Sequence, residues 1–131
     1  MGLKSKQILE FKETEIGKIP EDWNIYSLGT MLTLLKDGSH NPPKRVKMGI
    51  PFIAGATEIK YFDIDFSKAT YITKEDYDKI HKYFQVLKND ILLTIVGTVG
   101  NVAVVKESDL PFSLQRNIAI LRPNTELSYL Y

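Results

Sequence analysis

The segment from Asp90 to Lys106, DILLTIVGTVGNVAVVK, constrains the fold more than any other part of this chain. It is rich in Ile, Val and Thr, and it is broken by Gly97 and Gly100. Glycine adopts positive φ without steric cost, and β-branched runs on either side of such a break are typical of paired strands. We therefore predict two strands around a tight glycine-containing turn, in a fold organised around a sheet.

Shorter apolar runs elsewhere predict further strands. They are WNIYSL with Trp23, Ile25 and Leu28 facing inward, Leu32–Lys36 after one or two helical turns, Ile50–Ile53, Ala69–Ile72, and a strand pair from Phe112 to Leu121 that ends before Pro123. Thr73 with Asp76 three residues later resembles a capping box, so a helix begins at Thr73. Tyr77, Ile80 and Phe84 would form its apolar stripe, and His81 would lie on its surface.

Together these elements predict an α+β fold, with a largely antiparallel, curved or barrel-like sheet and one or two short helices. The chain has 131 residues, which favours one domain. Residues 1–18 alternate in charge and are expected to form a tail or a short irregular helix followed by a turn at Gly17, with residues 1–15 as the N-terminal tail.

Composition narrows the class of protein. The chain has no cysteine, which excludes disulfides and thiolate metal sites and is consistent with a reducing, cytoplasmic setting. It has no apolar run of roughly 18 residues and no secretory signal, so no membrane association is expected. Hydrophobic residues make up 44% and charged residues 25%, as in an ordinary globular domain.

The sequence offers no defensible catalytic set, no metal-ligand spacing and no cofactor motif. Ser39 lies beside His40, but no third group is placed to orient the pair. GTVG lacks the third glycine of a dinucleotide fingerprint and the Gly-Lys-Ser/Thr of a phosphate loop. Asp63 and Asp65 are expected at a solvated strand edge. Binding is therefore favoured over chemistry.

The segment from Lys36 to Ile53, KDGSHNPPKRVKMGIPFI, is the least regular part of the chain. Four cationic residues and one acidic residue, Asp37, lie between Lys36 and Met48, which leaves an excess of three positive charges. We call residues 36–47 the basic loop; if the protein has a side that faces an anion, this loop belongs to it. The alternative is a solvated loop with no such role.

Two further segments carry polar residues that interrupt the apolar pattern of the predicted strands. They are the hairpin Thr94–Asn101 and the triplet Gln115-Arg116-Asn117. Arg can bind guanine through two hydrogen bonds, and Asn and Gln can bind adenine in the same way. Alternatively, Gln115 or Asn117 satisfies a buried backbone group. The candidate DNA-binding residues are Lys36, Ser39, His40, Asn41, Lys44, Arg45, Lys47, Thr94, Thr98, Asn101, Gln115, Arg116 and Asn117.

Five motifs, in order over residues 14–123, resemble the target recognition domain of the specificity subunit of type I restriction–modification systems. They are ETEIGKIPEDWNIYSLGTM, KDGSHNPPKRVKMGIPFI, ATYITKEDYDKI, LKNDILLTIVGTVGNVAVV and SLQRNIAILRP. The resemblance implies a non-catalytic domain that reads one half of a split DNA target. It also implies partners: a second recognition domain, a modification subunit that methylates adenine and a restriction subunit that cuts DNA.

The resemblance implies in turn a single recognition domain over residues 16–123, with residues 124–131 as the start of a truncated spacer segment. The basic loop would then hold phosphates through Lys44, Arg45 and Lys47 and place Ser39, His40 or Asn41 near bases. Three alternatives remain open: a recognition domain of a type IIG-like restriction enzyme, a protein-interaction module that docks through Trp23 and the hairpin, and an enzyme with a pocket around His40 and Asp37.

Overall fold

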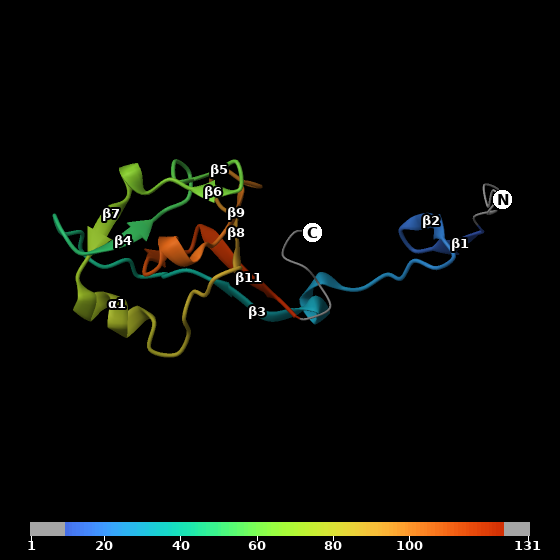
Figure 1. The fold of residues 1–131 in the computed structure, drawn as a ribbon, viewed down its shortest axis with the longest axis horizontal. Helices are drawn as coiled ribbons and strands as arrows, with labels where there is room; N and C mark the ends of the chain where they lie inside the picture. Colours follow the sequence, from blue (N-terminus) through green and yellow to red (C-terminus); the bar gives the residue numbers. More distant parts are fainter. Residues whose placement is uncertain (1–9, 125–131) are drawn as a thin grey trace, which may run out of the picture.

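The computed structural model describes residues 10–124. Residues 1–9 of the expected tail and residues 125–131 of the expected spacer segment lie outside this range. Figure 1 shows a body of packed sheets and, apart from it, a hairpin of β1 (Phe11–Thr14) and β2 (Gly17–Pro20). The expectation of a tail or irregular helix is wrong for Phe11–Thr14, because pairing with β2 makes this segment a strand. Residues 21–27 form an extended connection with no strand, so the expected WNIYSL strand is also wrong. Trp23 is 61% exposed, because this connection runs between the hairpin and the body and, among residues 10–124, is paired with no strand (Figure 1).

The body is built on a four-stranded antiparallel sheet with the order β3-β11-β8-β9. Its strands are β3 (Leu32–Asp37), which follows the short helix η1 (Leu28–Met31), β8 (Ile91–Thr94), β9 (Val102–Val104) and β11 (Ile118–Pro123). The helical turn before β3 and the two strands from Asp90 to Lys106 are thus confirmed. The turn between β8 and β9 is longer than predicted, since it takes all of residues 95–101.

Register fixes which residues share an end of this sheet. Ala119 pairs with Asp37, Ile118 with Thr94, and Leu93 with Val102. The last residues of β3 and β8 and the first residues of β9 and β11 therefore lie together, at what we call the Asp37 end.

A second, three-stranded sheet has β4 (Ile50–Ile53) in the middle, with β7 (Thr70–Ile72) antiparallel on one side and β10 (Ser113–Leu114) parallel on the other. The expected strand pair within Phe112–Leu121 is wrong in its pairing, because β10 and β11 belong to different sheets. The turn at residues 115–117 carries the chain from one sheet to the other. β11 also continues through Pro123.

A separate pair of strands, β5 (Ile59–Lys60) and β6 (Asp63–Ile64), completes the sheets. The structure is α+β, as predicted, but among the described residues the strands form several sheets and none closes into a barrel. The 3-10 helices η2 (Phe66–Lys68) and η3 (Glu107–Asp109) are short connections. Asp65 caps η2, and Asp63 forms an ion pair with Lys106 of 2.8 Å that lowers the pKa of this carboxyl.

The helix α1 (Lys74–Ile80) begins as predicted, with the amide of Asp76 donating to Thr73 Oγ1 over 3.1 Å. It ends before Phe84. The surface position expected for His81 is wrong: its side chain is only 2% exposed, and Nε2 lies 2.8 Å from Ser113 Oγ. The cause is that His81 caps the helix, where the chain turns and sets the ring against β10. Burial lowers the pKa of His81.

The core lies where the sheets face one another. Ile53 of β4, Leu92 of β8 and Ile118 and Ile120 of β11 are fully buried, together with Phe112. Each such side chain contributes about 1.5–3 kcal/mol through its removal from water. The core therefore holds the sheets, and the turns between them, in fixed relation.

Candidate nucleic-acid interface

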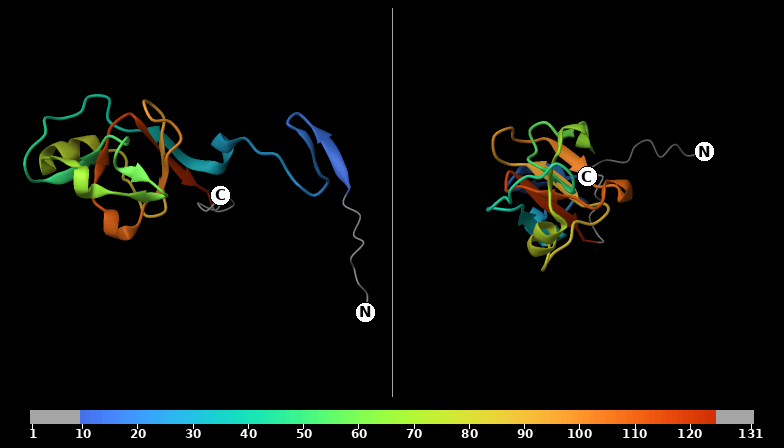
Figure 2. Two further views of the ribbon diagram at one scale, coloured as in Figure 1. Left: turned by 90° about the horizontal axis from the view of Figure 1, so that it is seen from above. Right: turned by 90° about the vertical axis from the view of Figure 1, so that its left-hand side faces the viewer.

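Three segments that are far apart in the sequence meet at the Asp37 end through main-chain hydrogen bonds. The amide of Ser39 donates to Leu114 O over 2.9 Å, and the amide of Arg116 donates to Ser39 O over 3.0 Å. The amide of Ile95 donates to Asn117 O over 2.8 Å. In the left view of Figure 2 these segments lie along one upper edge of the body. The structure thus unites the start of the basic loop, the 115–117 turn and the β8–β9 loop.

Gly38 makes this approach possible. A Cβ at this position would lie 2.4 Å from the carbonyl oxygens of both Leu114 and Gln115, which are backbone atoms that cannot rotate away. The amide of Gly38 also donates to Ile118 O over 3.1 Å. Gly38 was not among the predicted site residues, although a glycine at the end of a strand pattern is a known sign of close backbone approach.

Polar side chains surround this junction. His40 Nε2 lies 2.6 Å from Asp37 Oδ2, with both side chains open to solvent. Asn41 and Arg116 are exposed, and Ser39 is half-buried. Within residues 10–124 the guanidinium of Arg116 makes no hydrogen bond or ion pair, so its five donors remain available.

Gln115 and Asn117 flank Arg116 and are both half-buried. Their main chains are engaged, since the amide of Gln115 donates to Ile53 O over 3.0 Å and Asn117 O accepts from Ile95. Backbone pairing on both sides fixes the turn and therefore fixes the direction in which Arg116 leaves it.

The basic loop is partly tied down by its own arginine. Arg45 donates from Nε to Thr70 Oγ1 over 2.8 Å and from Nη1 to Pro43 O over 2.7 Å. Its guanidinium also lies 4.2 Å from the ring centroid of Phe52. Arg45, predicted as a phosphate contact, instead anchors the loop to the second sheet, because β7 and β4 supply its partners.

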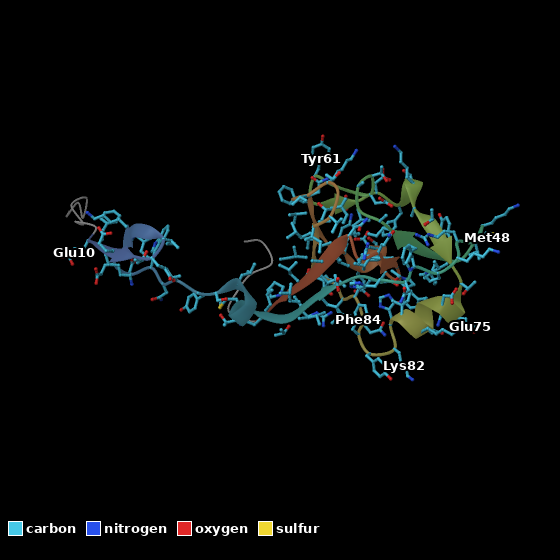
Figure 3. The ribbon with its side chains drawn as sticks, turned by 180° about the vertical axis from the view of Figure 1, so that it is seen from behind. Glu10, Met48, Tyr61, Glu75, Lys82 and Phe84 are labelled. Carbon is cyan, nitrogen blue, oxygen red and sulfur yellow. The ribbon has the colours of Figure 1, made fainter. Side chains whose placement is uncertain are left out.

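The other cations of the loop differ in their freedom. Lys36 Nζ lies 4.9 Å from the ring centroid of Phe84, in cation–π geometry. Lys44 and Lys47 are exposed, and Figure 3 shows the neighbouring Met48 pointing away from the body. Lys44 and Lys47 are therefore the cations of this loop that are free to meet a ligand.

The β8–β9 loop is likewise divided into a base and a tip. Thr94 is 1% exposed, and its hydroxyl accepts from the amide of Asn101 over 2.9 Å. Asn101 Nδ2 donates to Ile59 O over 3.0 Å. Thr94 and Asn101, both predicted as contacts, thus brace the loop from inside, since burial closes Thr94 to a ligand. Thr98, at the tip, is exposed.

A hollow of about 450 Å³ opens beside the junction. It is lined by Leu35, Lys36, Asp37, Ile95 and Ala119. The hollow is shallow and mixed in polarity, as suits the edge of a larger ligand rather than an enclosed small molecule.

No group of three or more His, Asp or Glu side chains within residues 10–124 is placed to hold a metal ion. No helix in that range is long and apolar enough to cross a membrane.

Comparison with known proteins gives two informative similarities. A Methanocaldococcus jannaschii protein, provisionally named the type I restriction enzyme MjaX specificity subunit, is 34% identical over 118 residues, covering 87% of this chain and 27% of that protein. The type I restriction enzyme EcoBI specificity subunit of Escherichia coli is 32% identical over 112 residues, covering 83% and 23%. No family model matches the chain.

The chain thus spans about a quarter of the length of these curated relatives. The similarity covers most of the chain. Over most of its length, the chain is therefore similar to a segment of type I restriction enzyme specificity subunits.

Proposed function

We propose that this chain reads a short stretch of double-stranded DNA, as one half of a split target of a type I restriction–modification system. The observation that supports this most is the junction at the Asp37 end. There the backbone bonds of Ser39, Arg116 and Asn117 gather three predicted segments around one exposed arginine. A rigid sheet that presents irregular polar loops is a usual arrangement for recognition.

The proposal divides the candidate residues by role. Arg116 is assigned to a guanine edge, to which a guanidinium group can donate two hydrogen bonds. Its neighbours are assigned to bases, and the exposed cations to phosphates. The base set is Ser39, His40, Asn41, Gln115, Asn117 and Thr98; the phosphate set is Lys44 and Lys47; Lys36, Arg45, Thr94 and Asn101 support these loops.

The remaining parts of the activity belong to other proteins or domains in this proposal. The chain itself performs no catalytic step, and partner subunits methylate and cut the DNA in the cytoplasm. A second recognition domain, in this or another chain, supplies the other half-site. The names of the relatives support such an assembly, since both are specificity subunits of restriction enzymes.

A second candidate function is protein docking, and it rests on the N-terminal hairpin and its connection. Trp23, Tyr26 and Ile16 are 61%, 60% and 72% exposed, on a segment that extends away from the body. Exposed aromatic side chains are enriched where proteins meet. If this were the main function, Trp23→Ser would abolish association with a modification subunit while the body would show no selective binding of DNA.

Affinity selection from a library of random duplexes tests the proposed function. The expected result is a short preferred sequence, bound with an affinity that falls steeply as salt rises, because phosphate contacts dominate binding. Recovery of random sequence after several rounds would reject the proposal. The selection is best run with and without a modification subunit, since a lone half-site reader is expected to bind weakly.

A further inference from the structure

The tip of the β8–β9 loop carries an apolar surface that the proposed function does not yet use. We define this tip as residues 95–100, IVGTVG. Ile95, Val96 and Val99 are 39%, 53% and 70% exposed. A single exposed apolar side chain needs no explanation, but three in six residues of one loop form a local surface.

The tip is held rigidly at its base. The amide of Thr94 donates to Asn101 O over 2.9 Å, and the amide of Gly100 donates to Thr94 O over 2.9 Å. Gly97 and Gly100 have φ of 78° and 97°, a region that favours glycine. No atom lies within 4 Å of a Cβ built at either glycine, so backbone shape rather than crowding requires them. The tip is therefore preorganised and open to solvent on its outer side.

The position of the tip relates it to the junction described above. Ile95 is bonded to Asn117 through the backbone, and its side chain lines the 450 Å³ hollow with Lys36 and Asp37. An apolar tip thus adjoins the loop that carries Arg116. The nearby exposed cations favour an anionic partner over a purely apolar one.

The chemistry of base edges identifies what such a tip could contact on DNA. In the major groove, thymine differs from the other bases by its 5-methyl group, which apolar side chains contact. We propose that Val96 and Val99 contact a thymine 5-methyl group, so that the half-site contains at least one A·T pair read by shape and methyl contact. This inference rests on the proposed function, since it places the same duplex against the same end of the sheet.

The test removes the methyl group alone. In the duplex obtained by selection, each thymine is replaced singly by deoxyuridine, and binding is measured by fluorescence anisotropy. At one position the wild-type chain is expected to lose affinity about fourfold, as follows from burial of one methyl group. The Val96→Ser/Val99→Ser chain is expected to bind the thymine and uracil duplexes equally.

A matched control is Leu87→Ser, which removes another exposed apolar side chain (45% exposed) beyond the opposite end of β8. This variant is expected to lose affinity about fourfold when thymine is replaced by deoxyuridine, as the wild-type chain does. Thermal unfolding of both variants checks that the exposed substitutions leave the fold intact.

The outcomes separate this inference from the proposed function. If the wild-type chain selects no sequence, both fail. If it selects a sequence but that sequence has no thymine, or no uracil replacement weakens binding, only the methyl contact is rejected. The methyl contact is also rejected if the Val96→Ser/Val99→Ser chain still binds the uracil duplex more weakly than the thymine duplex.

Discussion

At the scale of single residues, Arg122 forms an ion pair with the buried carboxylate of Asp90. Arg122 Nε lies 2.7 Å from Asp90 Oδ1, and Nη2 lies 2.9 Å from Oδ2. The aspartate is fully buried, and it raises the pKa of Arg122. Arg122→Met is expected to lower the free energy of unfolding by about 3–5 kcal/mol, because it leaves a buried carboxylate unpaired.

Urea unfolding measures this effect, and Lys74→Met is a suitable control. Lys74 pairs with Asp78 over 2.6 Å, but both side chains are largely exposed. Its loss is expected to change the free energy of unfolding by less than about 1 kcal/mol. Equal effects of the two substitutions would contradict a structural role for the buried pair.

A second residue-scale prediction concerns His81. Its ring is buried between Tyr77 and Phe84, and burial lowers its pKa from the ordinary value of 6.5. The unfolded chain therefore takes up a proton at a higher pH than the folded chain. The stabilisation from neutral His81 is complete above pH 6.5 and is lost as the pH falls through the lower pKa of the folded state.

Unfolding by urea at several pH values between 7.5 and 5 tests whether the free energy of unfolding falls on acidification. The wild-type chain should lose stability on acidification more than His81→Gln does. An exposed residue that does not titrate serves as the control, so Met48→Ser, at a side chain that is 87% exposed, should keep the wild-type slope. An unchanged slope in His81→Gln would show that other groups carry the pH dependence.

At the scale of elements, the end of β3 and the 115–117 turn are joined at Gly38. Gly38→Ala is expected to destabilise the protein by roughly 1–3 kcal/mol, as overpacking does. It should also weaken selective binding, because it pushes Ser39 away from Arg116. Denaturant unfolding and binding to the selected duplex measure the two effects.

Gly29→Ala is the matched control for this element. A Cβ at Gly29 in η1 would meet only Ser27 Oγ, at 3.9 Å, which is an ordinary contact. Both stability and binding should stay near the wild-type values. If Gly38→Ala behaved like Gly29→Ala, close approach at the junction would not matter.

Elements with a local sequence signal were predicted well from the sequence. The start of α1 follows from the Thr73 side chain, and the strands β4 and β8 follow from apolar runs bounded by polar or glycine residues. Which strands pair could not be predicted in the same way. The parallel pairing of β10 with β4 depends on contacts between segments about 60 residues apart, which periodicity does not encode.

For the candidate site too, the sequence shows which residues are polar but not which of them contact distant parts of the chain. Sequence identified Arg116, Lys44 and Thr98 as polar groups outside the core, and the structure places all three on the surface. It did not distinguish Thr94 and Arg45, whose polar atoms are used inside the protein. A threonine or arginine in a loop has the same signature whether it faces a ligand or braces the backbone.

At the scale of the whole molecule, we propose that the Asp37 end of the sheet reads DNA sequence through Arg116. The opposite end supplies a comparison within the same chain. Lys88 is exposed and precedes β8 on that side, so Lys88→Ala removes a positive charge away from the proposed face.

The most direct test is the ratio of affinities for the selected duplex and for a scrambled duplex, measured at one salt concentration. Arg116→Ala should reduce this ratio by the equivalent of about 1–3 kcal/mol, because a base contact is lost. Lys88→Ala should leave the ratio unchanged. A ratio unaffected by Arg116→Ala, or lowered as much by Lys88→Ala, would contradict the claim that this end reads sequence.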